Sequence, residues 1–383
     1  MALRIFLVYV LFLQLFWSTT AFHPLLSADI NVVLLLVTTA LLLITNIRSF
    51  TQKKYFGFAF MYIIAIGITF VMNSLVSMHS VLRLMSPIVI FYTMQPKDLK
   101  YYKPIFWTLI VFFVFNCGIA IYEKMTMSYY LTVDPNDEIM QAQQGGMIYT
   151  YGEEGFRAFS LIGHPLNNGN IMVYMSFIIY LTSYLNMKLR IGLMGLGMAS
   201  LFCFNTRGAI LISALLLVPT VWGFVKDNKG NRFIAFLAVL IAVCLLVVNF
   251  EKFGGRLMTG SLDDDSSMVR IYSIKEFLSL SFEQFLFGGH LPKYGENGYI
   301  MVIEVYGAVV GFVKILFEVF FSYKSVGINS SKKTKWIVML SLIAVGSTNN
   351  NLFFAKVFPF YVLCIIFISH YSKYLRHEDP LRL

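Results

Sequence analysis

The sequence predicts an all-α protein, a polytopic transmembrane helical bundle with two long non-cytoplasmic loops. Hydrophobic residues make up 58% of the chain and charged residues only 13%, and the mean hydropathy is +0.71. Soluble domains are roughly half apolar or less, with about a quarter of their residues charged. Apolar runs that approach the roughly 20 residues needed to cross a bilayer also recur along the whole chain. We therefore expect most of the protein to lie within a membrane.

Twelve apolar runs are predicted to span the membrane. They lie near 3–20, 28–47, 55–74, 79–95, 104–122, 169–187, 190–205, 208–225, 232–250, 297–321, 335–350 and 353–371. Two of them, 190–205 and 335–350, are short and carry Gly or Ser, so ten or eleven spans are also compatible with the sequence. The first run follows Arg4 and has the form of a signal peptide as well as that of a span.

The distribution of basic residues predicts the orientation of the bundle. If the N-terminus is cytoplasmic, 19 of the 30 Lys and Arg residues fall in cytoplasmic segments and nine in outer segments. This asymmetry places both termini inside. The chain then divides into N-terminal helices (1–122), an outer loop (123–168), central helices (169–250), a second outer loop with an amphipathic helix (251–296) and C-terminal helices (297–383).

Several classes of function lack support. The net charge of +10 does not indicate nucleic-acid binding, because the basic residues are spread over short loops between spans. All four cysteines lie within predicted spans, which argues against a disulfide framework or a thiolate metal site. Nucleotide-binding, zinc-protease and serine-hydrolase motifs are missing from the sequence. An enzyme acting on the outer face has no nucleotide sugar there, so it would use an activated lipid-linked substrate.

The stretch 256–306 is the longest polar excursion of the chain. Residues 268–287 carry apolar side chains at helical spacing, with charged residues on other faces, which predicts an amphipathic helix at the membrane surface. Gly288 and Gly289 end this helix, and Glu296-Asn297-Gly298 stands directly before the tenth span. The triple aspartate at 263–265 is explained as a solvated acidic turn or as a cation or sugar ligand.

Three arginines of the outer face suggest an anion site. Arg157 lies in GFRAFSLIGHPLNNGN, Arg207 begins a span in FNTRGAI, and Arg270 lies early in the amphipathic segment. Guanidinium groups bind phosphate oxygens bidentately, so together they would suit a pyrophosphate headgroup. Each one alone is also explained as an interfacial arginine that snorkels to water. Arg83, inside the fourth span, either contributes to this site or pairs with a buried acid.

These motifs, in this order, resemble the O-antigen polymerase and O-antigen ligase superfamily of bacterial membrane proteins. The resemblance covers residues 150–312 and is carried by Arg157, Gly163-His164-Pro165, Asn167, Asn205-Thr206-Arg207-Gly208-Ala209, Arg270, Phe287-Gly288, Glu296-Asn297-Gly298-Tyr299 and Gly307. The family usually has His-Pro-Asn where this chain has His-Pro-Leu-Asn-Asn, which leaves the family asparagine as either Asn167 or Asn168. The first five spans match only in being hydrophobic.

The resemblance implies a GT-C-like membrane glycosyltransferase that needs neither metal nor cofactor. Its donor would be an undecaprenyl-pyrophosphate-linked oligosaccharide, its acceptor a sugar hydroxyl, and the family arginines that engage the pyrophosphate carry over onto Arg157, Arg207 and Arg270. His164, Asn167, Asn297 and Tyr299 are further candidate substrate contacts. The setting implied is the bacterial inner membrane, with a periplasmic active site, surrounding lipid, a flippase and a chain-length regulator as partners.

The residue before the tenth span favours polymerase over ligase. Ligases usually carry a His-Asn pair there, with the histidine as proposed base, whereas this chain has Glu296-Asn297, as polymerases often do. Glu296 is then the candidate general base, or simply a carboxylate at the start of the tenth helix. His290 lies six residues upstream and is the alternative, ligase-like base. Glu304, further along the span, is a weaker site candidate, and loop aromatic residues such as Tyr151 and Phe156 are candidates to stack on sugars.

Two other classes remain open. A lipid-linked oligosaccharide flippase would also have many spans and outer cationic residues, but such transporters usually show internal repeats, and the two halves of this chain share no motif spacing. The other class is a structural or assembly membrane protein without catalysis, in which the arginine motifs would occur together only by chance.

Overall fold

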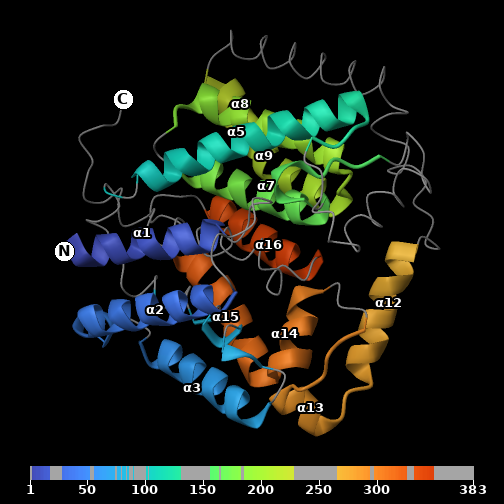
Figure 1. Ribbon diagram of the computed structural model, residues 1–383. Coiled ribbons are helices and arrows are strands. Elements are labelled where there is room, and N and C mark those ends of the chain that lie inside the picture. Colours follow the sequence, from blue (N-terminus) through green and yellow to red (C-terminus); the bar gives the residue numbers. More distant parts are fainter. Residues whose placement is uncertain are drawn as a thin grey trace. The chain divides into compact units, whose positions relative to one another are not determined.

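The computed structural model is all-helical in the residues that it describes, which confirms the predicted fold class at that level (Figure 1). The described residues are 2–17, 28–51, 56–73, 103–130, 156–163, 165–182, 185–227, 265–293, 297–325 and 332–348, with a few positions between 76 and 101. Two predicted spans, 232–250 and 353–371, lie outside these residues.

The chain forms two compact units. One unit comprises Met1–Trp107 and Asp265–Leu383, and the other comprises Thr108–Asp264. The second unit is therefore an insertion, in chain order, between the two parts of the first.

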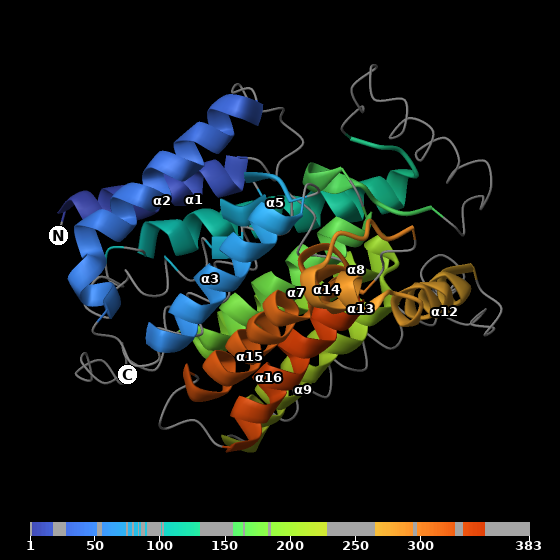
Figure 2. The ribbon, with the colours of Figure 1, turned by 90° about the horizontal axis from the view of Figure 1, so that it is seen from below.

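In the unit Thr108–Asp264, α7 lies at the centre of the packing. The helices are α5 (Lys103–Thr126, nearly all of it in this unit), the 3-10 helix η2 (Ser160–Ile162), α7 (Pro165–Leu181), α8 (Met187–Phe204) and α9 (Arg207–Asp227). Fifteen of the 17 residues of α7 are buried, and α7, α8 and α9 all pack against one another (Figure 2). The side chain of Asn186 caps the N-terminus of α8, and Asn205 ends α8 in a left-handed conformation.

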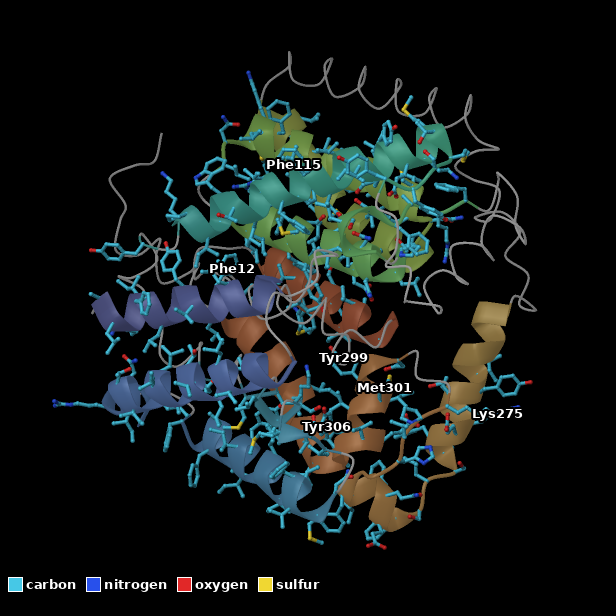
Figure 3. The ribbon with its side chains drawn as sticks, viewed as in Figure 1. Phe12, Phe115, Lys275, Tyr299, Met301 and Tyr306 are labelled. Atoms are coloured by element: carbon cyan, nitrogen blue, oxygen red, sulfur yellow. The ribbon has the colours of Figure 1, made fainter. Side chains whose placement is uncertain are left out.

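In the unit formed by the two chain ends, α15 is the shared packing partner. The helices are α1 (Ala2–Trp17), α2 (Ala28–Thr51), α3 (Phe56–Met72), α12 (Asp265–Leu278), α13 (Phe282–Phe287), α14 (Gly298–Tyr306), α15 (Ala308–Ser325) and α16 (Lys332–Thr348). Helix α15 packs against α3, α13, α14 and α16, while α1 pairs with α2. Helix α12 contacts α14 (Figure 3).

Two of the described helices, α5 and α8, are long and apolar enough to cross a membrane. Shorter apolar helical segments occur within α1, α2, α3, α9 and α16. The prediction of helices at 104–122 and 190–205 is confirmed, and the second of these was the less certain from sequence.

The predicted amphipathic helix 268–287 is wrong as a single element. The structure divides it into α12 and α13, because Ser281 begins a new helix with a capping box in which its side chain accepts from the Gln284 N–H. The Gln284 side chain in turn accepts from the Ser281 N–H. A serine followed three residues later by a glutamine indicates the start of a helix, but the apolar periodicity continues through this point and does not indicate a break.

The predicted tenth span, 297–321, is also not one continuous helix. It breaks at Gly307, whose φ of 88° lies in the left-handed region. A Cβ atom at Gly307 would lie 2.2 Å from the backbone oxygen of Leu286, and one at Gly288 would lie 2.3 Å from that of Val305. Two backbone segments therefore cross in direct contact here, and only glycine permits the approach.

Candidate functional site

Three groups on α5 and α7 hold the segment 156–163, which contains Arg157. Both oxygens of the Glu123 carboxylate accept backbone N–H groups: Oε2 from Phe159 at 2.7 Å and Ser160 at 2.9 Å, and Oε1 from Tyr130 at 2.9 Å. The Glu123 side chain is completely buried. Three charge-assisted bonds compensate the loss of hydration of this carboxylate, so it is a structural anchor for the segment.

Asparagine side chains complete the anchor. The Asn116 Oδ1 atom accepts from the Leu161 N–H at 3.1 Å and from the Ser160 hydroxyl at 2.9 Å, while its amide donates to Asn168 Oδ1 at 2.9 Å. The Asn168 amide then donates to the Phe159 carbonyl at 2.6 Å. These bonds hold Ser160 at a positive φ of 45°, an unusual conformation for a residue with a side chain.

The aromatic residues of this segment face inward. Phe156 is buried, it stacks on the ring of Tyr129 at a centroid distance of 4.9 Å, and its carbonyl accepts from Lys124 Nζ at 2.9 Å. Burial and the charge of Glu123 raise the pKa of Tyr129 to about 12, so the phenol stays neutral. The Phe156 ring, a candidate from the sequence to stack on sugars, is used in packing contacts in this structure.

Arg157 lies beside the turn between α8 and α9. Its Nη2 group donates to the backbone oxygen of Asn205 at 2.9 Å, and the N–H of the next residue, Ala158, donates to the backbone oxygen of Cys203 at 3.1 Å. Asn205 has a φ of 52°, a second non-glycine residue in the left-handed region at this place. The predicted motifs around Arg157 and Arg207 therefore do meet in space, since Arg207 is the first residue of α9.

Buried polar oxygens without partners lie in this turn and near the start of α7. Within the part of the chain that the structure describes, Asn167 Oδ1, Asn205 Oδ1 and Thr206 Oγ1 make no hydrogen bond. Thr206 packs on Gly169 near the start of α7, where an added Cβ atom would lie 2.6 Å from the Thr206 hydroxyl oxygen. Buried polar atoms nearly always make a hydrogen bond in native proteins, so the turn is suited to a polar ligand or to ordered water.

A second polar cluster lies in the other unit, on α12, α14 and the loop after α13. His290 Nε2 lies 3.0 Å from Glu276 Oε1, which also accepts the Lys293 N–H at 2.9 Å. The Glu304 side chain on α14 is completely buried, and neither of its oxygens has a hydrogen-bond partner among the described residues. One ligand atom from each of Glu276, His290 and Glu304 lies within 4.8 Å of the others.

Backbone bonds and α3 hold this second cluster in place. The N–H of His290 donates to the Glu304 carbonyl at 3.0 Å, and that of Gly289 donates to Val305 at 3.2 Å. Asn73, directly after the end of α3, also donates its side-chain amide to the Val305 carbonyl, at 2.7 Å. The cluster is thus built on the same backbone crossing that the glycines make possible.

Asn297 and Tyr299 have structural contacts at the start of α14. The Asn297 side chain is the N-cap and accepts the N–H groups of Tyr299 and Ile300 at 3.0 and 3.2 Å. The Tyr299 ring, labelled in Figure 3, is buried against Gly346 of α16. Substrate contact by either residue stays a prediction that the structure does not test.

Several predicted site residues lie outside the described residues. They are Arg83, His164 and Glu296, together with the loop aromatic residue Tyr151. Arg207 and Arg270 are described by their backbone alone, in α9 and α12. The predicted site residues therefore form two groups, one in each unit.

Sequence reasoning missed Asn116, Glu123 and Glu276 as site residues. Polar residues within or at the edge of an apolar run were the available signal for the first two. No protein-family model matches the chain, and no curated protein matches it at a significant level.

Proposed function

We propose that this protein is a membrane glycosyltransferase that polymerises undecaprenyl-pyrophosphate-linked oligosaccharide repeat units into a surface polysaccharide, such as an O-antigen of lipopolysaccharide, a capsule or an exopolysaccharide. The proposal rests on the family motifs of the sequence. One structural observation supports it most directly: a network of buried side chains holds Arg157 beside the α8–α9 turn, where Arg207 begins α9.

The chemistry of that turn suits an anionic headgroup. Guanidinium groups match phosphate oxygens, and the first N–H groups of a helix favour negative charge. The buried Thr206 hydroxyl and the Asn167 Oδ1 atom have no hydrogen-bond partner in the described residues, so a ligand with hydroxyl groups, which both donate and accept, would satisfy them. Non-glycine residues with positive φ, as at Ser160 and Asn205, also concentrate at functional sites.

The proposed reaction requires no metal at the reacting atoms. A sugar hydroxyl oxygen of one lipid-linked unit attacks the anomeric carbon of the growing glycan, and the bond from that carbon to the pyrophosphate oxygen breaks. Undecaprenyl pyrophosphate leaves with the bonding electron pair, and the arginines stabilise its developing charge. Glu296 accepts the hydroxyl proton in this proposal. The family motifs assign the same role to Arg270 of α12.

Exposed apolar side chains support a membrane setting. On α9 they form one stripe at helical spacing, Leu211, Leu215, Val218 and Trp222, each more than half exposed. An apolar stripe of this kind is unfavourable in water and favourable against lipid tails. We therefore propose a bundle of ten to twelve spans in the bacterial inner membrane, with both termini cytoplasmic and the site periplasmic.

An O-antigen ligase, which would transfer the glycan from the lipid carrier to lipid A-core, is the second candidate. It is favoured by the pairing of His290 with Glu276, because a carboxylate that orients an imidazole is a common arrangement for a histidine base. The polymerase remains our first proposal because Glu296-Asn297 occupies the position where ligases carry histidine and asparagine. No contact in the described residues favours the flippase.

Lysine substitution of Arg157, Arg207 and Arg270 tests the proposed donor site. Each variant should lose most polymer formation at normal protein level, because lysine keeps the charge but loses the bidentate geometry. Arg190→Lys is the matched control, since Arg190 also donates to a backbone carbonyl, that of Thr182, but lies at the predicted cytoplasmic end of the span 190–205. Normal polymer formation by all three site variants would show that these arginines only anchor the protein at the membrane interface.

A further inference from the structure

We infer that Glu276, His290 and Glu304 form a binding site for one first-row divalent transition-metal ion, with Zn²⁺ as its expected occupant. This site goes beyond the proposed glycosyl transfer and does not depend on it. The ion would fasten α12 and the loop after α13 to α14.

The distances suit a shared ion. His290 Nε2 and Glu276 Oε1 are 3.0 Å apart, and the ligand atoms of all three residues lie within 4.8 Å of one another. Ligands bound to zinc at about 2.0–2.2 Å in a tetrahedron lie about 3–4 Å apart, so only a small side-chain rotation is needed.

The strongest independent observation is the state of Glu304. Its side chain is completely buried, and its two oxygens have no hydrogen-bond partner in the described chain. Burying a carboxylate without compensation is very unfavourable, and the neighbouring Glu276 carboxylate adds repulsion. A bound cation would compensate for the lost hydration of Glu304 and for the repulsion between Glu304 and Glu276.

The donor set indicates which ion is preferred. One imidazole nitrogen and two carboxylate oxygens suit Zn²⁺ or Mn²⁺, whereas Ca²⁺ and Mg²⁺ prefer oxygen donors alone. Three protein ligands leave a position for water. His290 and Glu276 are partly exposed, with side-chain exposures of 29% and 16%, so solvent and ions reach this side of the cluster.

The backbone holds the three ligands together before any ion arrives. His290 donates its N–H to the carbonyl of Glu304 itself, at 3.0 Å, so these two ligands are coupled through their main chains. The Lys293 N–H orients Glu276 in the same way, by donating to the oxygen that faces His290. Such outer bonds fix ligand orientation in metal sites.

Occupation by a metal ion would also assign a role to His290. A histidine whose Nε2 atom binds an ion cannot take a proton at that atom. The general base would then be Glu296, in agreement with the polymerase and not with the ligase.

Metal analysis of the purified full-length protein in detergent tests the site. After chelator treatment and refilling with ZnCl₂, we expect one Zn²⁺ per chain by mass spectrometry and a raised unfolding temperature. Glu304→Gln and His290→Ala should each weaken Zn²⁺ binding at least tenfold and abolish the thermal shift.

Two controls keep the outcome clear. Glu283→Gln on α13, an exposed carboxylate, and Glu296→Gln should both retain the ion, although the second should lose polymerisation. If the Glu304 variant fails to fold, Glu276→Gln, at the partly exposed edge of the cluster, replaces it as the ligand variant. Absence of stoichiometric Zn²⁺ or Mn²⁺ in the wild-type protein, or equal binding by the ligand variants and the Glu283 control, would overturn the inference.

Discussion

At the scale of single residues, the buried polar side chains carry the most information. Glu123 accepts three backbone N–H groups, and two of them come from a segment more than 35 positions later in the chain. Bonds to a charged acceptor contribute about 1.5–3 kcal/mol each. The position of Arg157 therefore depends on a carboxylate that never needs to touch a substrate.

Replacement of Glu123 by alanine should destabilise the protein by about 3 kcal/mol or more, because three donors lose their acceptor and each buried unpaired donor costs about 1–3 kcal/mol. Glu123→Gln should have an intermediate effect, since the amide keeps one acceptor oxygen. Thermal unfolding in detergent measures both, and Glu283→Ala, on the exposed face of α13, is the control. Equal unfolding temperatures for Glu123→Ala and this control would show that the anchor contributes nothing.

The roles of these residues differ in how well the sequence predicts them. Arg157 and Arg207 stand in short motifs, so the sequence identified them, with Arg270, as candidates for one anion site, and the structure brings the first two motifs together at one turn. Glu276 could not be identified, because its partner His290 lies on a separate loop after a helix break. A carboxylate on an amphipathic helix has the same sequence pattern whether it faces water or a neighbouring histidine.

At the scale of elements, periodicity located the described helices but not their interruptions. The run 297–321 is apolar throughout its length, so hydropathy predicts one span, yet Gly307 divides it into α14 and α15. The break depends on a left-handed glycine and on the backbone of Leu286, which is a tertiary contact. Hydrophobic periodicity contains no signal for such a contact.

Substitution of Gly307 by alanine tests the importance of this break. The new methyl group would lie 2.2 Å from the Leu286 oxygen, and φ would remain strained, so we expect a loss of stability well above the roughly 1 kcal/mol typical of a point substitution. Gly118→Ala in α5 is the matched control, because a Cβ atom there meets nothing within 4 Å. Alanine should leave that helix unchanged or stabilise it slightly. Similar unfolding temperatures for the two variants would contradict the proposed crossing.

At the scale of the whole molecule, composition predicted the helical class, and the described residues agree with it. Two helices meet the length and hydropathy of a membrane crossing, and α9 exposes an apolar stripe. Orientation across a membrane depends on where the lysines and arginines lie, which the sequence supplies. The way in which the two groups of site residues act together could not be derived, because each group lies in its own unit.

The proposed orientation has a direct test. Ser261, in the second outer loop, should become labelled by a membrane-impermeant thiol reagent in intact spheroplasts after Ser261→Cys substitution. A cysteine introduced by Ser330→Cys, in the loop 322–335 that the orientation predicts to be cytoplasmic, should react only after permeabilisation. The opposite pattern would place the arginine motifs on the cytoplasmic side and remove the basis of the enzymatic proposal.

Deletion of the gene in the source organism, followed by gel electrophoresis of the surface polysaccharide, tests the central claim most directly. A polymerase acts after the first repeat unit has been made and exported, so its loss stops elongation alone. We predict that long chains disappear while a single capped repeat unit remains, and that the wild-type gene restores the ladder but the Arg157→Lys variant does not. An unchanged ladder would contradict the account, as would the accumulation of full-length polymer on the lipid carrier, which indicates a ligase, or of single lipid-linked units inside the cell, which indicates a flippase.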